Sequence, residues 1–541
     1  MKTVIMTYSL SRSSAFGLRS GRLAVKRPVP TGDYEIQSSI MADVLVYHYG
    51  ALPSIIGVTM ADLNNPLLWR SCYKPFAVAI VQPLTNNTTL VRDHWGISPL
   101  YYCRSQDQLI FGQSIPDIIK HLPNTPLFAA SQIKRLFTEP QYDDSGETLY
   151  QGIYRVPPGH MLHFKPDGSI TKEAFWQLER HGPTLYYAND CDYLEHFSLL
   201  MQEALLNATE NQTNIAAEFS AGLDSSAIYC AARNMKVTPK LFMHVNLGTD
   251  ADNQYNDHYE NAFLEHYQIK DIARIGADDF DPLQVLTDYA SLFAGPAPYL
   301  FFMFASPLHR AVSAGKHPVL LSGFGGDQCV SCQLSPHFFI PELIHQGAYS
   351  QAWRELSPSI GIKKGLRYAA YSHAALYALQ LKIKKLWRQT HPYERIYYKS
   401  AREVQWSLLQ GPDSYEVRMR IEYSSLVSKN MGFEYRYPLL YPKLVEFMLS
   451  LPTDVNRRDG RGRYLIRQYL SKNIPKAGFN TYRKQEGLGI VPAAFDTFKQ
   501  NYQQGHYQDA FNDLPYPHLI QHPHAPTELS NRIKGFMLKR C

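Results

Sequence analysis

Residues 219–226 of this 541-residue chain read Phe-Ser-Ala-Gly-Leu-Asp-Ser-Ser, and this stretch decides how the rest of the sequence is interpreted. The mostly apolar residues 214–219 predict a short strand, and residues 227–232 predict the start of a helix. A strand–loop–helix unit with small loop residues can hold phosphate, because backbone N–H groups approach closely and the helix N-terminus adds a positive dipole. The stretch therefore predicts a phosphate-binding loop.

The loop side chains have separate expected roles. The small Gly222 lets the backbone approach a phosphate, and the hydroxyls of Ser220, Ser225 and Ser226 can donate to phosphate oxygens. Asp224 cannot face a polyphosphate alone, because like charges repel, so we expect it to bind magnesium. The alternative is an ordinary strand-to-helix turn with a Ser or Asp N-cap.

The loop lacks the Gly-Lys-Ser/Thr ending of a Walker A loop. It resembles the Ser-Gly-Gly-x-Asp-Ser-Ser pyrophosphate loop of ATP pyrophosphatases, which cleave ATP to AMP, as in the asparagine synthetase family. Ala221 stands where that family usually has its second glycine. This departure matters only if the position needs a positive φ.

Length and composition bound the class of protein. A chain of 541 residues with 45% hydrophobic content predicts two or three globular domains. A net charge of +6 is too small to indicate a nucleic-acid partner, although it could favour an anionic ligand or an acidic peptide. The seven scattered cysteines favour a reducing compartment, with the Cys329-x-x-Cys332 pair as buried thiols. We found no signal-peptide pattern and no apolar run of about 18–20 residues, so we expect a cytoplasmic protein without a membrane span.

Residues 1–180 alternate short β-rich segments with turns, which predicts a mainly β or α+β domain. Three phrases in it, at residues 92–102, 152–160 and 175–176, resemble signatures of the glutamine-hydrolysing half of asparagine synthetase. This resemblance implies an Ntn-hydrolase-like α+β sandwich. The family nucleophile is a cysteine exposed as the first mature residue, whereas here Lys2 follows Met1 and the first cysteine is Cys72. An internal cysteine has no free α-amine to act as base. We therefore expect a glutaminase-like domain that lacks the nucleophile and serves as a scaffold or docks a peptide.

Residues 181–541 are expected to form an ATP-binding ligase domain. Predicted strands at 214–219 and 241–247 alternate with helices, which implies an α/β fold with a doubly wound parallel sheet and a nucleotide at the carboxyl ends of its strands. In the family the strand that holds Val245 borders the adenine. Residues 413–541 read as a mostly helical C-terminal part.

A second glycine-rich loop follows another apolar run, because residues 319–327 read Val-Leu-Leu-Ser-Gly-Phe-Gly-Gly-Asp. Alone, it would be an ordinary turn after a strand. Beside the first loop it resembles the second family motif, in which Ser322, Gly323 and Gly325 contact the nucleotide. Asp327 would then supply the other magnesium contact, together with Asp224.

Phe324 departs from the family pattern. The matching residue is a Glu tied to ammonia use in asparagine synthetases and a Tyr of a catalytic dyad in β-lactam synthetases. Phe can neither transfer a proton nor stabilise charge. It suits an apolar substrate wall.

Residues 432–440 match the family element Gly-x-Glu-x-Arg-x-Pro-x-Leu, with Tyr441 in place of an Asp. Glu434 and Arg436 can form a buried ion pair that shapes the site, or Glu434 can take part in catalysis. Glu422, on the preceding helix, is a candidate acid/base partner.

Residues 482–487 resemble the Arg/Lys segment that closes over the acyl-adenylate in the family. A cation there stabilises charge that develops on the α-phosphate and on the tetrahedral intermediate. The resemblance assigns this role to Lys484, with Arg483 as a second candidate.

A basic helical insertion at residues 335–400 has no counterpart among these motifs. It is either an amphipathic surface helix or a surface for an acidic leader peptide or a membrane face.

The resemblance implies that ATP and Mg²⁺ activate a carboxylate as an acyl-adenylate, which an amine then attacks to form an amide. The missing N-terminal cysteine, Phe324 and the basic insertion resemble lasso-peptide macrolactam synthetases. Those enzymes join the N-terminal amine of a precursor peptide to an Asp or Glu side chain, with a leader peptidase and a leader-binding protein as implied partners. The alternatives are an ammonia-dependent asparagine synthetase, a β-lactam-type synthetase, or a non-catalytic protein that binds nucleotide or peptide.

Overall fold

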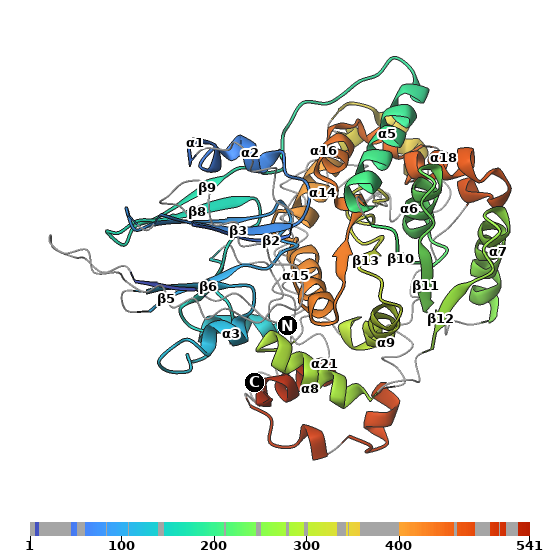
Figure 1. Cartoon of the computed structure of the whole chain (residues 1–541). Coiled ribbons are helices and arrows are strands. Elements are labelled where there is room, and N and C mark those ends of the chain that lie inside the picture. Colours follow the sequence, from blue (N-terminus) through green and yellow to red (C-terminus); the bar gives the residue numbers. More distant parts are fainter. Residues whose placement is uncertain are drawn as a thin grey trace.

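The structure is a computed structural model of the chain. It describes residues 6–9, 45–50, 60–82, 84–105, 108–138, 145–209, 212–244, 250–276, 281–296, 301–332, 342–344, 346–356, 400–458, 462–481, 498–507, 509–515 and 528–540. These residues form an N-terminal part with two antiparallel sheets and a C-terminal part built on one parallel sheet (Figure 1).

The two N-terminal sheets stack face to face. One contains, in spatial order, β2 (Leu45–Gly50), β3 (Phe76–Gln82), β4 (Asn87–Arg92), β8 (His160–Phe164) and β9 (Ile170–Ala174). The other contains β1 (Met6–Ser9), β6 (Gln108–Gly112), β5 (Tyr101–Ser105) and β7 (Ile153–Arg155). All their pairings are antiparallel.

Side-chain alternation explains how these sheets are covered. In β3, Ala77, Ala79 and Val81 join the core between the sheets, while Val78 and Ile80 pack with Trp69 on the opposite face. Trp69 belongs to α2 (Pro66–Arg70), which follows α1 (Met60–Leu63). The outer face of the second sheet packs on α3 (Ile115–Ile119), and α4 (Ala130–Thr138) follows α3 in the chain. This layered arrangement is the predicted α+β sandwich.

The C-terminal part is organised around a parallel sheet. Its spatial order is β12 (Ile272–Ile275), β11 (Lys240–His244), β10 (Ile215–Glu218), β13 (Val319–Leu321) and β14 (Glu434–Arg436). The chain proceeds from β10 outward to β12, then returns to the other side of β10 for β13 and β14. Because such crossovers are right-handed, their helices lie on opposite faces of the sheet. The predicted doubly wound fold is confirmed.

The change of direction creates a switch point between β10 and β13. These neighbours pair in parallel, with Ile215 opposite Val319 and Ala217 opposite Leu321. Both strands therefore end at the same level, and the two predicted phosphate loops follow them side by side. In open α/β sheets this is the place where ligands bind.

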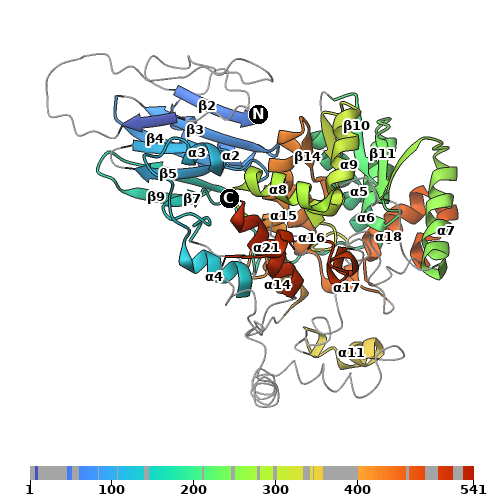
Figure 2. The same cartoon turned by 90° about the horizontal axis from the view of Figure 1, so that it is seen from below.

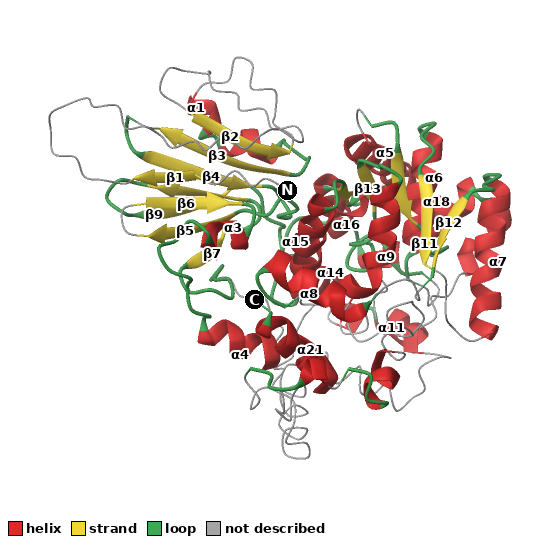
Figure 3. Ribbon diagram, turned by 60° about the horizontal axis from the view of Figure 1, so that its bottom comes forward, coloured by secondary structure: helices red, strands yellow, loops and turns green. Residues whose placement is uncertain are grey.

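Helices enclose this sheet and form most of the remaining C-terminal part (Figures 1 and 3). Among them, α5, α6 and α18 pack against one another, α9 contacts β11, and α15 contacts β14. The bounds of the helices are α5 (Asp190–Thr209), α6 (Leu223–Asn234), α7 (Asp250–His266), α8 (Pro282–Phe293), α9 (Phe301–Ala314), α11 (Tyr349–Leu356), α14 (Ala401–Leu409), α15 (Tyr415–Asn430), α16 (Pro442–Ser450), α17 (Thr453–Asn456), α18 (Tyr464–Asn473) and α21 (Glu528–Lys539). Short 3₁₀ segments are η1 (Pro438–Leu440), η2 (Pro475–Ala477), η3 (Phe479–Thr481) and η4 (Asp509–Phe511).

The C-terminal helix α21 lies beside α8 and near α4, away from the parallel sheet (Figure 2). Within the described part of the chain, no helix is both long and apolar enough to cross a membrane. Of the predicted basic insertion at residues 335–400, residues 335–341, 345 and 357–399 lie outside the described residues.

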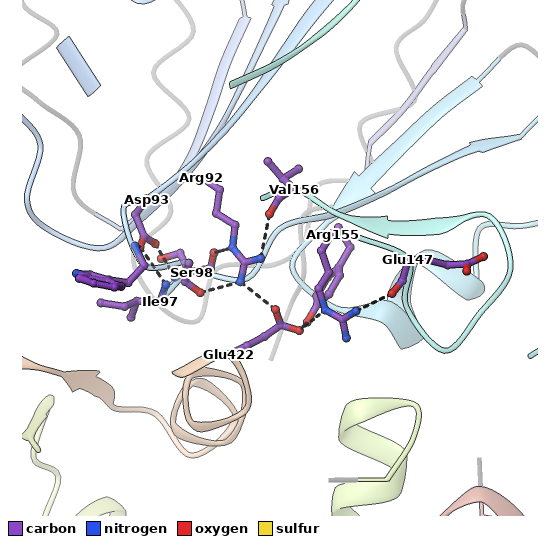
Figure 4. A network of polar contacts seen from close by, with 11 residues as sticks. Arg92, Asp93, Ile97, Ser98, Glu147, Arg155, Val156 and Glu422 are labelled. Atoms are coloured by element: carbon purple, nitrogen blue, oxygen red, sulfur yellow. Dashed lines mark hydrogen bonds and ion pairs between the residues drawn. The ribbon is translucent and has the colours of Figure 1, made fainter. Parts of the chain in front are cut away.

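The N-terminal and C-terminal parts share one apolar core and a buried polar network (Figure 4). Arg92, at the end of β4, and Arg155, at the end of β7, both form ion pairs with Glu422 of α15, at 3.1 and 2.9 Å. The Tyr101 hydroxyl donates to the same carboxylate at 2.8 Å. Two of the N-terminal sequence motifs thus meet on a single side chain of the C-terminal part.

Candidate active site

The first loop has the shape expected of an anion-binding turn. Its helix, α6, begins at an N-cap Gly222 that makes no side-chain capping hydrogen bond. This geometry differs from the Ser- or Asp-capped turn that was the alternative, and it leaves the first N–H groups of α6 without a capping side chain. Such a helix N-terminus favours a phosphate.

The serines of this loop divide into two groups. Ser225 Oγ accepts from the Ser220 backbone N–H at 3.2 Å and lies 3.3 Å from Ser220 Oγ, so these two hold the loop together. Ser226 is fully buried, and within the described part of the chain its hydroxyl has no hydrogen-bond partner. A buried hydroxyl without a hydrogen-bond partner is unfavourable. The Ser226 hydroxyl is therefore suited to donate a hydrogen bond to an oxygen of a bound ligand.

Ala221 has a backbone φ of +53°, and its side chain is buried. This is the left-handed region that glycine adopts without strain and alanine does not. The backbone at this position therefore has a positive φ, which would explain why the resembled motif has its second glycine there. In this chain the alanine adopts the same φ at the cost of some backbone strain.

Both loops are in direct contact at the switch point. A Cβ on Gly323 would lie 3.1 Å from Asp224 Cβ, and one on Gly326 would lie 2.4 Å from the Asp224 carboxyl carbon. Gly325 has φ +95°, and a Cβ there would collide with Leu440 at 2.4 Å. The second loop is thus glycine-rich because the first loop and η1 occupy the space next to it.

Asp327, at the end of the second loop, forms an ion pair with Arg463 at 3.0 Å. Arg463 is almost fully buried and has a left-handed backbone, with φ +67°, immediately before α18. Its guanidinium therefore holds the half-exposed side chain of Asp327 in place at the end of the second loop. None of the sequence motifs assigned this contact.

The donor set fits a magnesium ion that arrives with a nucleotide. Within the described part of the chain, no group of three or more His, Cys, Asp or Glu side chains could hold a metal by itself. Magnesium usually binds through one or two carboxylates together with phosphate oxygens and water. Asp224 and Asp327, on two loops in contact, are the carboxylates that would take this part.

Phe324 lies within the second loop, and a cation and an aromatic ring both contact its side chain. The guanidinium of Arg420, on α15, lies over the Phe324 ring, with its carbon 4.9 Å from the ring centroid. Tyr437 meets the same ring edge-on at 6.1 Å. The Arg420 guanidinium therefore lies beside position 324, where the resembled enzymes have a Glu or a Tyr.

Glu422 lies at the contact with the N-terminal part, which differs from its expected acid/base role. Burial alone would raise the pKa of its carboxyl, but the charges of Arg155 and Arg92 and the hydrogen bonds that it accepts outweigh this and lower the pKa to about 2. A carboxylate held in this way is a weak base and is not protonated near neutral pH. The geometry gives Glu422 a structural role.

Glu434 forms an ion pair with Arg436 within β14. The pair itself is the one that we gave as the alternative to a catalytic role, but it is not buried, because the Glu434 side chain is 36% exposed.

The first cysteine of the sequence does not supply a nucleophilic thiol. Burial raises the pKa of Cys72 to about 12, so its thiol stays protonated. Cys329 and Cys332 are buried thiols as expected, and burial raises the pKa of both above its ordinary value.

Three predicted site residues, Val245, Arg483 and Lys484, lie outside the described residues. The strand β11 ends at His244, directly before Val245.

Sequence reasoning missed a carboxylate behind the loops. Glu218, at the end of β10, accepts hydrogen bonds from the hydroxyls of Ser322 and Tyr435. His309 of α9 lies 2.7 Å from the Tyr435 hydroxyl. The available signal was a charged residue that ends an otherwise apolar strand directly before the loop.

Comparisons with known proteins match both parts of the chain. The family model described as asparagine synthase matches residues 196–528, and the model described as a glutamine amidotransferase domain matches residues 68–176. Asparagine synthetase [glutamine-hydrolyzing] 2 of Bacillus subtilis is 22% identical over 434 residues, covering 74% of this chain and 54% of that protein. Asparagine synthetase [glutamine-hydrolyzing] 3 of the same organism is 26% identical over 188 residues, covering 35% and 30%.

These matches span about half, or less, of the length of the curated relatives. Among solved structures, a glutamine phosphoribosylpyrophosphate amidotransferase from B. subtilis matches 39% of this chain and 48% of its own, with 11% identity and a TM-score of 0.17. A TM-score this low does not indicate a shared overall fold.

Proposed function

Because this chain belongs to the asparagine synthase family, we propose that it is an ATP-dependent, AMP-forming amide ligase. One structural observation is the main support for this proposal. The uncapped N-terminus of α6 and the carboxylate of Asp224 meet the second glycine-rich loop at the switch point of the parallel sheet. Such an arrangement is suited to hold the pyrophosphate part of ATP beside a reacting carboxylate.

The residues at the switch point have separate roles in the proposed activation of the carboxylate. The N–H groups of α6 and the Ser226 hydroxyl bind phosphate oxygens. Asp224 and Asp327 would hold Mg²⁺, which offsets the charge of the leaving pyrophosphate when it is bound. Lys484, by resemblance, stabilises charge on the α-phosphate while the acyl-adenylate forms and is consumed.

For the amine, we propose the N-terminus of a precursor peptide, which would make the chain a lasso-peptide macrolactam synthetase acting on an Asp or Glu side chain. Phe324 supports a substrate other than ammonia, because it lacks the groups of the resembled synthetases. A leader peptidase and a leader-binding protein would be the partners.

Asparagine formation is the second candidate. The similarity to a B. subtilis asparagine synthetase extends over 74% of the chain and favours it. The buried Cys72 thiol does not supply a glutaminase nucleophile, so this activity would use free ammonia.

Mass spectrometry of products formed with ATP and Mg²⁺ tests these functions. One reaction contains aspartate and ammonia, and another contains a lasso-type precursor with its leader peptidase and leader-binding protein. AMP together with a peptide that has lost one water establishes the cyclase, whereas asparagine in the first reaction establishes the second candidate. ATP that is bound but never consumed in either reaction indicates a non-catalytic binder. Asp224→Ala and Lys484→Ala should abolish product and leave the fold intact.

A further inference from the structure

The carboxylate of Glu218 ties together the ends of three neighbouring strands. Glu218 ends β10, Ser322 follows β13, and Tyr435 lies within β14. Ser322 donates to one carboxylate oxygen, and the Tyr435 hydroxyl donates to the other at 2.8 Å. Because β10, β13 and β14 are consecutive in the sheet, one side chain links all three at the edge where the loops begin.

These contacts continue toward the second loop. The backbone N–H of Phe324 donates to Ser322 Oγ at 3.3 Å, so the hydroxyl that donates to Glu218 also accepts from the loop. The direction of this hydroxyl is therefore set at both ends. A rotation of Ser322 would release the backbone of Phe324.

On the other side, His309 keeps the Tyr435 hydroxyl in its donating orientation. Burial lowers the pKa of His309 to about 3, so its ring is neutral and carries one N–H. Since the Tyr435 proton points to Glu218, His309 Nε2 is the nitrogen that donates to the Tyr435 oxygen across 2.7 Å.

A carboxylate is not what the strand itself requires. The three preceding residues of β10 are apolar and buried, and an apolar residue of similar size would continue their pattern. Ser322 and Tyr435 are fully buried, and a charged acceptor forms hydrogen bonds with them that are about twice as strong as neutral ones. Glu218 therefore orients two hydroxyls that neither strand pairing nor apolar packing would orient.

We propose that Glu218 is a positioning residue of the second phosphate loop. Through the Ser322 hydroxyl it holds the Phe324 backbone, and with it the loop that carries Asp327. Ser322 then acts by holding the loop, and not by contacting the nucleotide as the sequence predicts. The effect of Glu218 on nucleotide binding rests on the proposed function, whereas its effect on loop order does not.

The test compares Glu218→Leu, Glu218→Gln, Ser322→Ala and the Glu218→Leu/Ser322→Ala double variant in the full chain. Hydrogen exchange of the Phe324 amide, without nucleotide, reports loop order. Calorimetric titration with ATP and Mg²⁺ reports affinity.

We expect Glu218→Leu to speed the exchange and to weaken ATP binding, each by about tenfold, the scale of one lost hydrogen bond to a charged group. Glu218→Gln keeps one acceptor oxygen and should stay within about threefold of the wild type.

Ser322→Ala should weaken ATP binding in the wild type and have no further effect in the Glu218→Leu background, because both changes break the same link. Glu203→Leu is the matched control. Glu203 of α5 also accepts from a tyrosine hydroxyl, that of Tyr441 at 3.2 Å, and from Lys443, but from neither loop.

Two results would overturn the proposal. One is an unchanged Phe324 exchange rate in a folded Glu218→Leu variant. The other is additive losses of affinity in the double variant, which would mean that Ser322 binds the nucleotide itself. If the wild type binds no ATP, the proposed function fails, and the exchange rates still decide the role of Glu218.

Discussion

Asp224 occupies the space in front of Gly326, so that a Cβ on this glycine would lie 2.4 Å from the Asp224 carboxyl carbon. Gly326 does not have a positive φ. The need for glycine at this position therefore comes from the carboxylate of the neighbouring loop and not from the backbone angle. The two loops form one unit, and a change in one displaces the other.

Substitution of Gly326 should therefore damage the site through Asp224. We expect Gly326→Ala to lower the stability by about 1–3 kcal/mol, as overpacking does, and to lower kcat/KM at least about tenfold because Asp224 moves. Gly323→Ala, with a calculated separation of 3.1 Å from Asp224 Cβ, should be milder. Activity assays and thermal unfolding would show this order. Gly276→Ala, at a position with nothing within 4 Å, is the control and should behave as the wild type.

The left-handed backbone of Ala221 gives a second prediction. In Ala221→Gly, relief of about 1 kcal/mol of strain is opposed by the greater freedom of the unfolded chain and by the loss of a buried methyl group. We expect a net change in the free energy of unfolding of less than about 1 kcal/mol, with ATP binding retained. Ala221→Val should destabilise clearly, because a β-branched residue is strained at this φ. Equal stabilities of the Gly and Val variants, measured in urea, would contradict the backbone assignment.

Glu422 should be a main contributor to the docking of the two parts. Glu422→Gln leaves the buried charges of Arg92 and Arg155 without their counter-charge, and removal of one partner from a buried pair costs about 3–5 kcal/mol. Urea unfolding of the full chain measures this loss. Glu446→Gln is the comparison, because Glu446 accepts from the neutral Trp176 N–H, and we expect about 1 kcal/mol there. A Glu422→Gln variant as stable as the wild type would show that the ion pairs do not hold the parts together.

The same residue predicts a pH dependence. Its folded pKa, about 2, lies below its ordinary value of 4.5, so Glu422 contributes stability above pH 4.5 that is lost as the pH falls toward 2. The shift corresponds to about 3 kcal/mol. Across this window, wild-type stability should fall more steeply than that of Glu422→Gln, which has no proton to gain at this position. Parallel slopes between pH 4.5 and 2 would contradict the assignment.

Much of the fold follows from local patterns. The strand–loop–helix units around residues 219–226 and 319–327 are encoded by short apolar runs followed by small and polar residues, which depend little on distant contacts. The parallel sheet follows from the same alternation. The site residues on these loops could be named for the same reason, since each loop is a local structure.

Residues that act across the chain could not be assigned in this way. Glu422 reads as an acid/base candidate on a helix near a family motif, yet its partners, Arg92 and Arg155, are hundreds of positions away. Glu218 reads as the end of a strand, and its role depends on Ser322 and Tyr435 from two other strands. The pKa of a carboxylate is set by the charges around it, and the sequence does not show which charges those are.

By itself, the sequence determined the strands and helices around residues 219–226 and 319–327, the two loops between them and their order along the chain, because backbone preference and apolar periodicity are local properties. Only the tertiary structure decided which carboxylate faces which partner: Asp224 against Gly326, Asp327 on Arg463, Glu218 beneath the second loop and Glu422 between two arginines. The physical reason is that hydrogen bonds and charge interactions in a buried site depend on distance and desolvation, and both are fixed only when distant segments pack together.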